Sequence, residues 1–566
     1  MGFQVSPGVE VKEIDLTNVI PAVSTSIGGF AGYFKWGPVN QIALISSEKG
    51  LLQKFGTPDS SVLYADPFFQ AASFLQYGEA LKVVRGGSSS DFSNASDLDA
   101  ADSPDNGVWI PNQTYFEETF TSLEGGTFAA RYPGAAGNSL KVYALNETDY
   151  AALNDSPSDA DDLEGQAVFN SFDLAPDATE IHVAVIDVNG VFGEAGQIIE
   201  KFAGLDISKT AKTAAGATNY IKNVINAQSQ YVYLIAGDST AFVAADFTGG
   251  YQLGGGTEAT GGESPSLLDS DTMTALDFLA DSEIEDVNLI FSQIEDTGAT
   301  LQNYTHSIAY TRKDAVAFLS PPKSATVNQT NPLAAVRTFA NTDITNRGAD
   351  GSYGVIDSGA LYIYDRYNDV YRYIPANGHI AGLCANTDDV AEPWFSPAGF
   401  NRGSLRNIVK VAYNPKKADR DELYKAGVNP VAAFPGNGIV LFGDKTAQAK
   451  PSAFDRINVR RLFIVLEKAI ATAAKYQLFE LNDEFTRASF RNAVEPFLRG
   501  VQARRGITDF LVVCDDTNNT GDVIDTNRFV ADIYIKPARS INFITLNFIA
   551  TRTGVDFAEV AGLSNA

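Results

Sequence analysis

Strand-like and helix-like segments alternate through the middle of the chain, between about residues 180 and 346. TEIHVAVIDV, YVYLI, DVNLIFS and AVAFLS have the composition of strands, whereas AGQIIEKFAGL, NYIKNVINAQ and TMTALDFLAD have the pattern of short amphipathic helices. Neighbouring parallel strands need a crossover connection, and a helix usually provides it. The alternation therefore predicts a layered α/β core with a partly parallel sheet.

Composition divides the rest of the chain. With 566 residues there is room for three or four domains of ~100–200 residues each. Residues 88–125 and 146–165 are rich in Ser, Asp and Ala, which indicates long surface loops or the edge of an inserted domain. We expect a mixed α/β (α+β), multidomain fold with these parts: an extended N-terminal arm at 1–20, an inner domain at 21–87 and 347–566 that ends in a second arm at about 541–566, a β-rich outer insertion at 88–178, and a middle α/β domain at 179–346.

Two long helices are predicted near the end of the chain, at 454–478 and 482–506. Pro496 is expected to kink or split the second helix, because proline has no amide hydrogen to donate. At 100° per residue, the first helix places five cations on one arc of about 140°: Arg456, Arg460, Arg461, Lys468 and Lys475. Most of its apolar residues lie opposite. The pattern predicts an outward basic strip, either a solvated face or a docking surface for an acidic partner.

The formal net charge of −27 is distributed unevenly. Residues 451–566 contain 14 basic and 14 acidic residues, which leaves 28 basic and 55 acidic residues for the first 450. An acidic surface repels nucleic acid and anionic membranes, so nucleic acid is not expected as a partner. The neutral C-terminal part is the one that can approach an acidic protein.

Signals for secretion and membrane insertion are missing from the sequence. The longest apolar runs, such as LFIVL at 462–466, are far shorter than the ~20 residues of a membrane span. MGFQVSPG has neither the charged nor the apolar region of a signal peptide. Cys384 and Cys514 are too few for a disulfide framework, which fits a reducing cytoplasm. We expect a soluble protein, assembled in the cytoplasm, without direct membrane insertion.

A search for catalytic motifs finds no candidate. His182, His306 and His379 lie in unrelated segments, without the spacing of HExxH or of paired cysteines that a zinc site needs. The sequence has no GxSxG motif, and the glycine-rich stretch GGYQLGGGTEATGG lacks the GK[ST] ending of a phosphate-binding loop. We therefore assign no catalytic, cofactor-binding or metal-binding residues and expect no enzyme activity and no cofactor.

Both ends of the chain have the period-2 pattern of a strand. In SPGVEVKEID, Val9 and Val11 alternate with charged residues. In SINFITLNFIA, alternate residues share one apolar face: Ile544, Leu546, Phe548 and Ala550. Each such strand needs a partner, which is either an edge of its own sheet or a strand of another copy.

Five groups of motifs together resemble the tail sheath protein of contractile-tailed bacteriophages. They are SPGVEVKEID; GEAGQIIEKFAGLDIS followed by NYIKNVINAQSQYV; YIPANGHIAGLCANTDDVAEPWFSPAGFNRGSL; INVRRLFIVLEKAI, which FEL-ND continues into the next helix; and the C-terminal strands. They occur in the order of the family and cover roughly residues 1–85 and 180–566, whereas 88–178 does not carry the resemblance. The same core builds the sheaths of phage-tail-like bacteriocins and other contractile injection systems, which remain an alternative.

The resemblance implies a structural subunit of a virion, synthesised and assembled in the host cytoplasm. Subunits of this family stack as six-fold rings around an inner tail tube, between a baseplate and a tail terminator. When the baseplate triggers, the metastable sheath shortens and drives the tube through the host envelope, which delivers the genome. No nucleotide is hydrolysed at that moment, because the energy comes from a switch between two packings of the same fold.

Such a machine needs links that hold while subunits shift, and a releasable contact with the tube. Strands added to neighbouring sheets provide the first. The candidates are Val9, Glu10, Val11, Lys12 and Glu13 at one end and Ile544, Leu546 and Phe548 at the other. An electrostatic contact suits the second, and the arc of Arg456, Arg460, Arg461, Lys468 and Lys475 is the candidate.

Two other classes of protein are alternatives to this interpretation. A different self-assembling shell or filament protein explains the acidity and the extended ends, but not the ordered motifs. An acidic extracellular hydrolase with a carboxylate pair would need a signal peptide, and the sequence begins without one.

Overall fold

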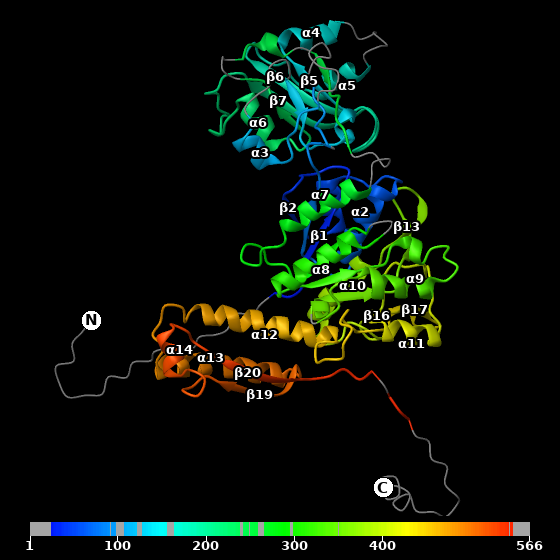
Figure 1. The fold of residues 1–566 in the computed structure, drawn as a ribbon. Coiled ribbons are helices and arrows are strands. Elements are labelled where there is room, and N and C mark those ends of the chain that lie inside the picture. Colours follow the sequence, from blue (N-terminus) through cyan, green and yellow to red (C-terminus); the bar gives the residue numbers. More distant parts are fainter. Residues whose placement is uncertain are drawn as a thin grey trace, which may run out of the picture.

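The computed structural model describes residues 24–90, 92–97, 107–120, 127–155, 163–237, 242–247, 249–258, 265–294, 298–348, 350–542 and 544–546. These residues form three parts arranged one above the other (Figure 1). An outer β-rich domain lies above a central α/β domain, and a pair of long helices with a small sheet lies below it. Within these ranges, no helix is long and apolar enough to cross a membrane.

The central domain is built on a seven-stranded sheet that brings together strands from distant parts of the sequence. Its order is β16 (Val428–Asn429), β12 (Gly354–Asp357), β11 (Val316–Leu319), β10 (Leu289–Ser292), β1 (Gly28–Gly32), β3 (Leu81–Arg85) and β2 (Ile42–Ile45). All neighbours are parallel except β2, which pairs antiparallel with β3 at one edge. The predicted layered, partly parallel sheet is confirmed.

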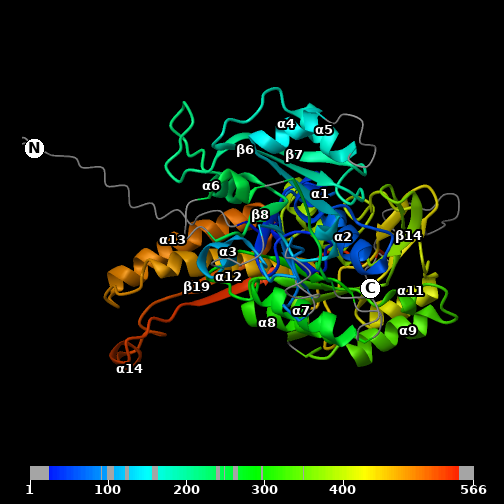
Figure 2. The same cartoon turned by 90° about the horizontal axis from the view of Figure 1, so that it is seen from above.

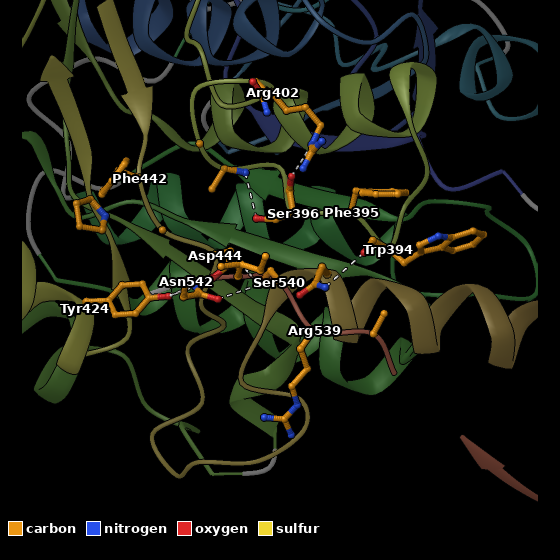
Figure 3. A pocket seen from close by; sticks show the side chains of 18 of the residues that line it. Trp394, Phe395, Ser396, Arg402, Tyr424, Phe442, Asp444, Arg539, Ser540 and Asn542 are labelled. Carbon is orange, nitrogen blue, oxygen red and sulfur yellow. Dashed lines mark hydrogen bonds between the residues drawn. The ribbon is translucent and has the colours of Figure 1, made fainter. Parts of the chain in front are cut away.

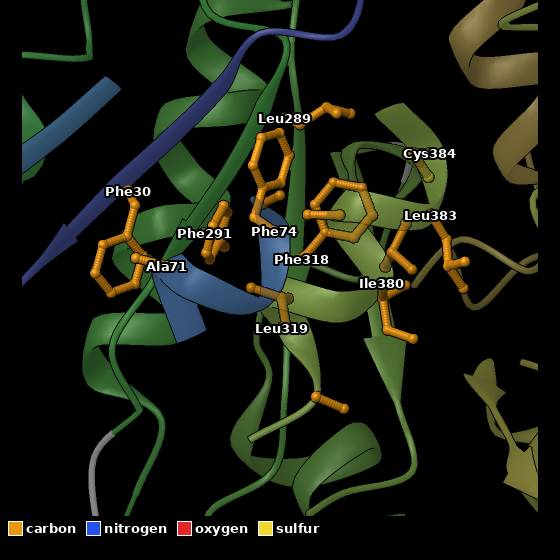
Figure 4. Close-up of a cluster of buried hydrophobic side chains, with 14 of the residues drawn as sticks. Phe30, Ala71, Phe74, Leu289, Phe291, Phe318, Leu319, Ile380, Leu383 and Cys384 are labelled. Atoms are coloured by element: carbon orange, nitrogen blue, oxygen red, sulfur yellow. The ribbon is translucent and has the colours of Figure 1, made fainter. Parts of the chain in front are cut away.

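Both faces of this sheet are covered, as a parallel sheet requires. Successive residues of a strand point to opposite faces, and Phe30 and Ala31 of β1 belong to two different apolar clusters. The helices α2 (Val62–Phe74) and α10 (Asn377–Val390) contribute to the larger cluster (Figure 4), and α7 (Pro265–Asp277) and α8 (Thr300–Arg312) contribute to the other. The central strands are therefore buried on both sides.

The remaining elements of the central domain lie around this sheet. They are α1 (Glu48–Phe55), α9 (Pro332–Thr338), α11 (Lys417–Lys425), and the strands β13 (Leu361–Asp365), β14 (Val370–Ile374), β15 (Lys410–Val411), β17 (Val431–Phe434) and β18 (Gly438–Leu441). In β13 and β14, tyrosine rings contact one another across the ladder, with Tyr362 and Tyr371 stacked at 5.6 Å between ring centroids. Tyr364 and Tyr371, both in the Tyr-rich stretch YDRYNDVYRY, also pair across the ladder, with ring centroids 5.1 Å apart.

The outer domain contains a four-stranded antiparallel sheet, in the order β7 (Gln197–Asp206), β6 (Glu180–Asp187), β5 (Leu140–Leu145) and β9 (Gly250–Gln252). A second pair, β4 (Phe128–Ala130) and β8 (Val232–Leu234), and the helices α3 (Gln113–Glu118), α4 (Glu147–Asp155), α5 (Leu163–Ser171) and α6 (Ile221–Gln228) complete it. The helix predicted for AGQIIEKFAGL is wrong, because these residues form β7. Its backbone pairs with β6 along the whole strand, and this pairing overrides the helical spacing of its apolar residues.

The sheets group the chain differently from the predicted domain boundaries. A boundary at 178/179 would separate β5 from β6, which pair over six residue pairs. A boundary at 346/347 would separate β11 from β12, which pair in parallel. The described strands between 92 and 258 therefore belong to the outer domain, whereas β10 and β11, within 265–346, belong to the central sheet. Composition marks surface loops, but it does not show which strands hydrogen-bond.

The lower part contains α12 (Ile457–Lys475), α13 (Glu484–Ala503), α14 (Gly521–Asp525) and a two-stranded sheet of β19 (Ile507–Val513) and β20 (Asp532–Pro537). Seen from above, α12 and α13 run side by side and extend to one side of the molecule, while α11 lies at the other (Figure 2). α13 continues through Pro496, so the predicted split does not occur. Asn492, whose carbonyl loses its helical partner, is exposed, so water can replace the missing hydrogen bond.

Candidate assembly surfaces

The three histidines are separate from one another and do not build a reactive centre. His182 stacks on Phe172, and its Nε2 lies 2.7 Å from the Leu174 carbonyl oxygen. His306 and His379 are buried in the central domain, and burial lowers the pKa of His379 to about 3. In the described ranges, no group of His, Cys, Asp or Glu is arranged to hold a metal ion.

Arg456 and Arg460, two of the five cations predicted to face outward, turn toward the central domain. Arg456 precedes the first turn of α12 and lies 3.2 Å from the carboxylate of Asp444, in a partly buried ion pair. Arg460 is only 6% exposed, and its guanidinium lies between two aromatic rings, 4.0 Å from the Phe454 centroid and 4.2 Å from that of Tyr353. Burial lowers the pKa of Arg460. Cation–π contacts on both faces stabilise the desolvated charge.

Arg461 makes the most complete polar contact between α12 and the central domain. Its Nη2 donates to Asp388 Oδ2 of α10 at 2.6 Å and to the Thr25 carbonyl at 3.1 Å, and Nη1 donates to the Cys384 carbonyl at 3.2 Å. The side chains of Arg461 and Asp388 are only 4% and 8% exposed. Burial raises the pKa of Asp388, and the guanidinium opposes that rise. The ion pair therefore fastens α12 to α10 and to the segment before β1.

Lys468 and Lys475 lie further along α12. Lys468 forms an ion pair with Asp286 in the loop that precedes β10, so it also faces the central domain. Lys475, in the last turn, is exposed, and among the described residues no ion pair to it is found. The prediction of an outward strip is therefore corrected: Arg460 and Arg461 are buried, Arg456 and Lys468 are paired, and Lys475 alone of the five is freely exposed.

The physical reason is that α12 has apolar residues on both sides. Leu462, Leu466 and Ile470 pack in the core of the helical part, whereas Ile457 and Ile464 belong to the core of the central domain. These two isoleucines interrupt the amphipathic pattern in the sequence. They were the signal that the basic side of α12 faces a second core rather than solvent.

Further exposed cations of this part lie at the end of α13. Arg499 is 71% exposed and 3.4 Å from Glu495, and Arg504 is 51% exposed and 3.0 Å from Glu392. Arg505 is exposed and has a φ of +68°. Arg487, by contrast, is buried and donates to Asp516.

The sheet of β19 and β20 is a candidate surface for pairing with another strand. Within the described part of the chain it has two strands only, and α13 packs against β19. Leu511 and Tyr534 are 57% and 59% exposed on its strands. Two-stranded sheets are marginal alone, and their free edges are templates for another strand.

The chain continues past β20 into an exposed segment. Ile541, Ile544 and Leu546 are 83%, 78% and 71% exposed, and the described residues from 538 to 546 form no strand. Ser540 and Asn542 hold the beginning of this segment to Asp444 by hydrogen bonds of 2.8 and 3.0 Å. The predicted arm residues Val9, Glu10, Val11, Lys12, Glu13 and Phe548 lie outside the described residues.

Two further surfaces were not predicted from the sequence. The turn between α12 and α13 exposes five large apolar side chains: Tyr476, Leu478, Phe479, Leu481 and Phe485. The second surface is a groove of about 1430 Å³ between the loop at 394–402, α11 and the segment that follows β20 (Figure 3). The stretch YQLFELNDEF, apolar where two helices must turn, was the available signal for the first surface. The groove depends on three distant segments and has no signal in the sequence.

Comparison with known proteins agrees with this architecture. The chain matches the phage tail sheath protein central domain over residues 269–447 and the phage tail sheath C-terminal domain over residues 449–551. It is 34% identical to the tail sheath protein of Vibrio phage KVP40, over 98% of this chain and 99% of that protein. It is 33% identical to the tail sheath protein of Enterobacteria phage T4, over 99% of each. Residues 88–178, which carried no resemblance, thus lie almost wholly within the matched region.

Solved structures show the same fold at lower identity. A sheath tail protein from Listeria innocua superimposes with a TM-score of 0.54 at 12% identity, over 91% of this chain and 96% of that one. A sheath complex of an extracellular contractile injection system, in the contracted state, gives a TM-score of 0.50 at 13% identity, over 97% and 99%. Because two relatives above 30% identity match along their whole length, the chain belongs to the tail sheath protein family of contractile bacteriophage tails.

Proposed function

We propose that this chain assembles as six-fold rings that stack into a sheath around an inner tail tube, between a baseplate and a tail terminator protein. Contraction of the sheath drives the tube through the host envelope. The observation that carries the proposal is the chain's exposed apolar end beside a two-stranded sheet with free edges. A subunit with an exposed apolar segment of strand-forming pattern, and with a sheet edge that pairs with no other described strand, is suited to link to its own copies.

The links are strands exchanged between copies. Ile544, Leu546 and Phe548 alternate along the C-terminal arm, and Val9 to Glu13 alternate along the N-terminal one. Each arm adds to an edge of the β19–β20 sheet of a neighbour. Backbone hydrogen bonds hold such a junction, so the body of a subunit can rotate about its arms while the lattice stays connected.

The first test is self-assembly. Purified protein at increasing concentration is expected to form hollow, helically ridged tubes in negative-stain microscopy. Deleting residues 1–14 is expected to leave a folded, soluble protein that forms no tubes, because one arm is lost. Tubes of normal length from the shortened chain would show that the N-terminal strand is not a link between subunits.

The contact with the tail tube is assigned to exposed cations of the helical part. Lys475, the member of the predicted arc that remains free, and Arg499 on α13 are the candidates. This part of the chain is neutral overall, whereas the rest carries the whole negative charge. Contacts between exposed charges are individually weak, which suits a surface that must hold the tube and then release it.

Charge reversal tests this assignment. Lys475→Glu and Arg499→Glu together are expected to abolish assembly on purified tail tube while sparing polymer formed without the tail tube. Binding is followed by co-sedimentation with the tail tube at low and high salt, since exposed pairs weaken with ionic strength. A matched control reverses Lys49 and Lys209, which are exposed on the central and outer domains. Equal loss of tail-tube binding in both double variants would contradict a specific surface.

A further inference from the structure

The turn between α12 and α13 carries an apolar surface that the subunit leaves uncovered. The side chains are exposed by 64% to 104%: Tyr476, Leu478, Phe479, Leu481 and Phe485. Single exposed apolar residues are ordinary, but a concentration of large ones at one point marks a contact surface. We call these five residues the tip.

The backbone conformation of the tip supports a role in contact with another molecule. Phe479 has a φ of +70° and is fully exposed. A bulky side chain in this region is a strained outlier, and glycine or asparagine would fit there with less strain. Because Phe479 touches nothing that stabilises the subunit, folding does not account for a phenylalanine at this position. A contact made outside the subunit does.

A complementary surface lies at the other end of α12, around the groove of Figure 3. Phe442 lines the groove, and Phe400 and Phe434 contact it from beside the groove, with ring centroids 5.0 to 5.8 Å apart. Phe400 and Phe442 are 51% and 40% exposed. Arg420 lies over Phe434 and Phe442, at 5.3 and 5.7 Å. The groove, at about 1430 Å³, is larger than the sites that small ligands usually occupy, so it suits a protein segment.

The charges of the two surfaces are opposite. The tip sequence YQLFELNDEF contains Glu480, Asp483 and Glu484 and no basic residue. The groove is lined by six basic residues, Arg402, Lys417, Arg420, Lys425, Arg505 and Arg539, and by two acidic ones, Asp421 and Asp444. Asp444 is already paired with Arg456. Opposite charges around apolar centres orient two surfaces toward each other and exclude the wrong pairings.

The positions of the two surfaces determine the kind of contact. Asn458, in the first turn of α12, lines the groove, and the tip follows Lys475 at the end of the same helix. A helix of 19 residues spans about 28 Å, so one subunit cannot bring its own tip to its own groove. Two different complementary surfaces on one subunit make a head-to-tail contact, which closes into a ring or continues as a helix.

We propose that the tip of one copy docks in the aromatic, basic groove of the next copy. This contact rests on the proposed polymerisation and adds to it a specific pair of surfaces, distinct from the arms. Phe479 and its neighbours cover Phe400 and Phe442, and Glu480 faces the cations of α11. The strain at Phe479 is retained because the ring is used in the assembly.

Cysteine cross-linking tests the pairing directly. Cys384 and Cys514 are buried, so they contribute little background under mild oxidation. A mixture of Phe479→Cys and Phe400→Cys is expected to give disulfide-linked dimers, and the double variant is expected to give a ladder of larger disulfide-linked species. Each single variant alone should form no disulfide-linked species. The head-to-tail pairing would be overturned if the mixture formed no disulfide-linked dimers, or if Phe479→Cys alone formed them faster than the mixture. So would suppression by a peptide of residues 1–23, which would assign the groove to the N-terminal arm.

Assembly measurements separate this contact from other uses of the tip. Phe479→Asn is expected to raise the concentration needed for tube formation at least tenfold with no loss of thermal stability, because asparagine tolerates the backbone. Leu174→Asn, at an apolar site of the outer domain that is 79% exposed, is the control and should change nothing. Glu480→Lys and Lys417→Glu should each weaken assembly, and their combination should restore it. Phe479→Asn could instead assemble normally without the tail tube and lose only its binding to the tail tube. The tip would then belong to the contact with the tail tube. The docking proposal would fail, whereas the proposed sheath function would stand.

Discussion

Replacing Arg461 with Met is expected to lower the free energy of unfolding by about 3–5 kcal/mol, because it leaves Asp388 as a buried carboxylate without its counter-ion. Thr25 would still donate to Asp388, at 2.7 Å, but a neutral hydroxyl cannot replace a guanidinium. The variant also loses the donors to the carbonyls of Thr25 and Cys384. Denaturant unfolding of the wild type and the variant measures the difference.

The loss of unfolding free energy in Arg461→Met is expected to depend on pH. Burial raises the pKa of Asp388, and without Arg461 nothing comparable opposes it. The folded variant then binds a proton that the unfolded chain has released, so its stability falls as the pH rises above about 4, the usual pKa of an unfolded aspartate. The difference from the wild type should therefore be smaller at about pH 5 than at about pH 8. An equal difference at both values would contradict the electrostatic explanation.

Arg504 provides the matched control. It also pairs with a carboxylate, Glu392 at 3.0 Å, but its side chain is 51% exposed. Arg504→Met is expected to cost less than about 1 kcal/mol, with little change over the same pH range. Pairing Arg461→Met with Asp388→Leu should recover part of the stability, since removing both charges leaves no buried ion.

Disrupting one face of the C-terminal arm is expected to abolish tube formation without unfolding the subunit. Ile544 and Leu546 share a face and are 78% and 71% exposed, so Ile544→Asp with Leu546→Asp removes apolar contacts that exist only in the assembly. Two charges buried against a neighbour's sheet would cost several kcal/mol per junction. The fraction of protein in the pellet after centrifugation is expected to fall at least tenfold.

A charge introduced at Thr545 distinguishes the loss of the arm's apolar face from the mere addition of charge. It lies between the two apolar residues and is exposed, and in a strand it points the opposite way. Thr545→Asp is therefore expected to assemble nearly as well as the wild type. If it fails to the same extent as the double variant, the arm does not dock as a strand with one apolar face.

The sequence predicted elements with strong local patterns and missed those whose conformation depends on distant partners. The strands β10 and β11 of the central sheet and the helices α12 and α13 were predicted, because apolar runs and long periodic segments carry their own signal. The strand β7 was taken for a helix, because its pairing with β6 is invisible in IIEKF alone. The domain boundaries differed because composition cannot show that β1, β10 and β16 share one sheet.

The candidate site was predicted less completely than the fold. Four of the five predicted cations lie on α12 and Arg456 precedes it, and the position of a second core decides which way most of them face. Ile457 and Ile464 held that information as exceptions to the pattern. The groove around Phe442 brings together residues from 394 to 542, which no local pattern connects.

The outer domain enters and leaves the central domain at nearly the same place. The chain departs after Arg85 at the end of β3 and returns in α7, and a Cβ at Gly86 would lie only 2.8 Å from the Asp271 carbonyl oxygen. The seven-stranded sheet is complete without any residue from 92 to 258. A short linker across these adjoining points could therefore replace the entire domain. A related or foreign domain with neighbouring termini could also be inserted there, so that every subunit carries it while the core and its junctions stay unchanged.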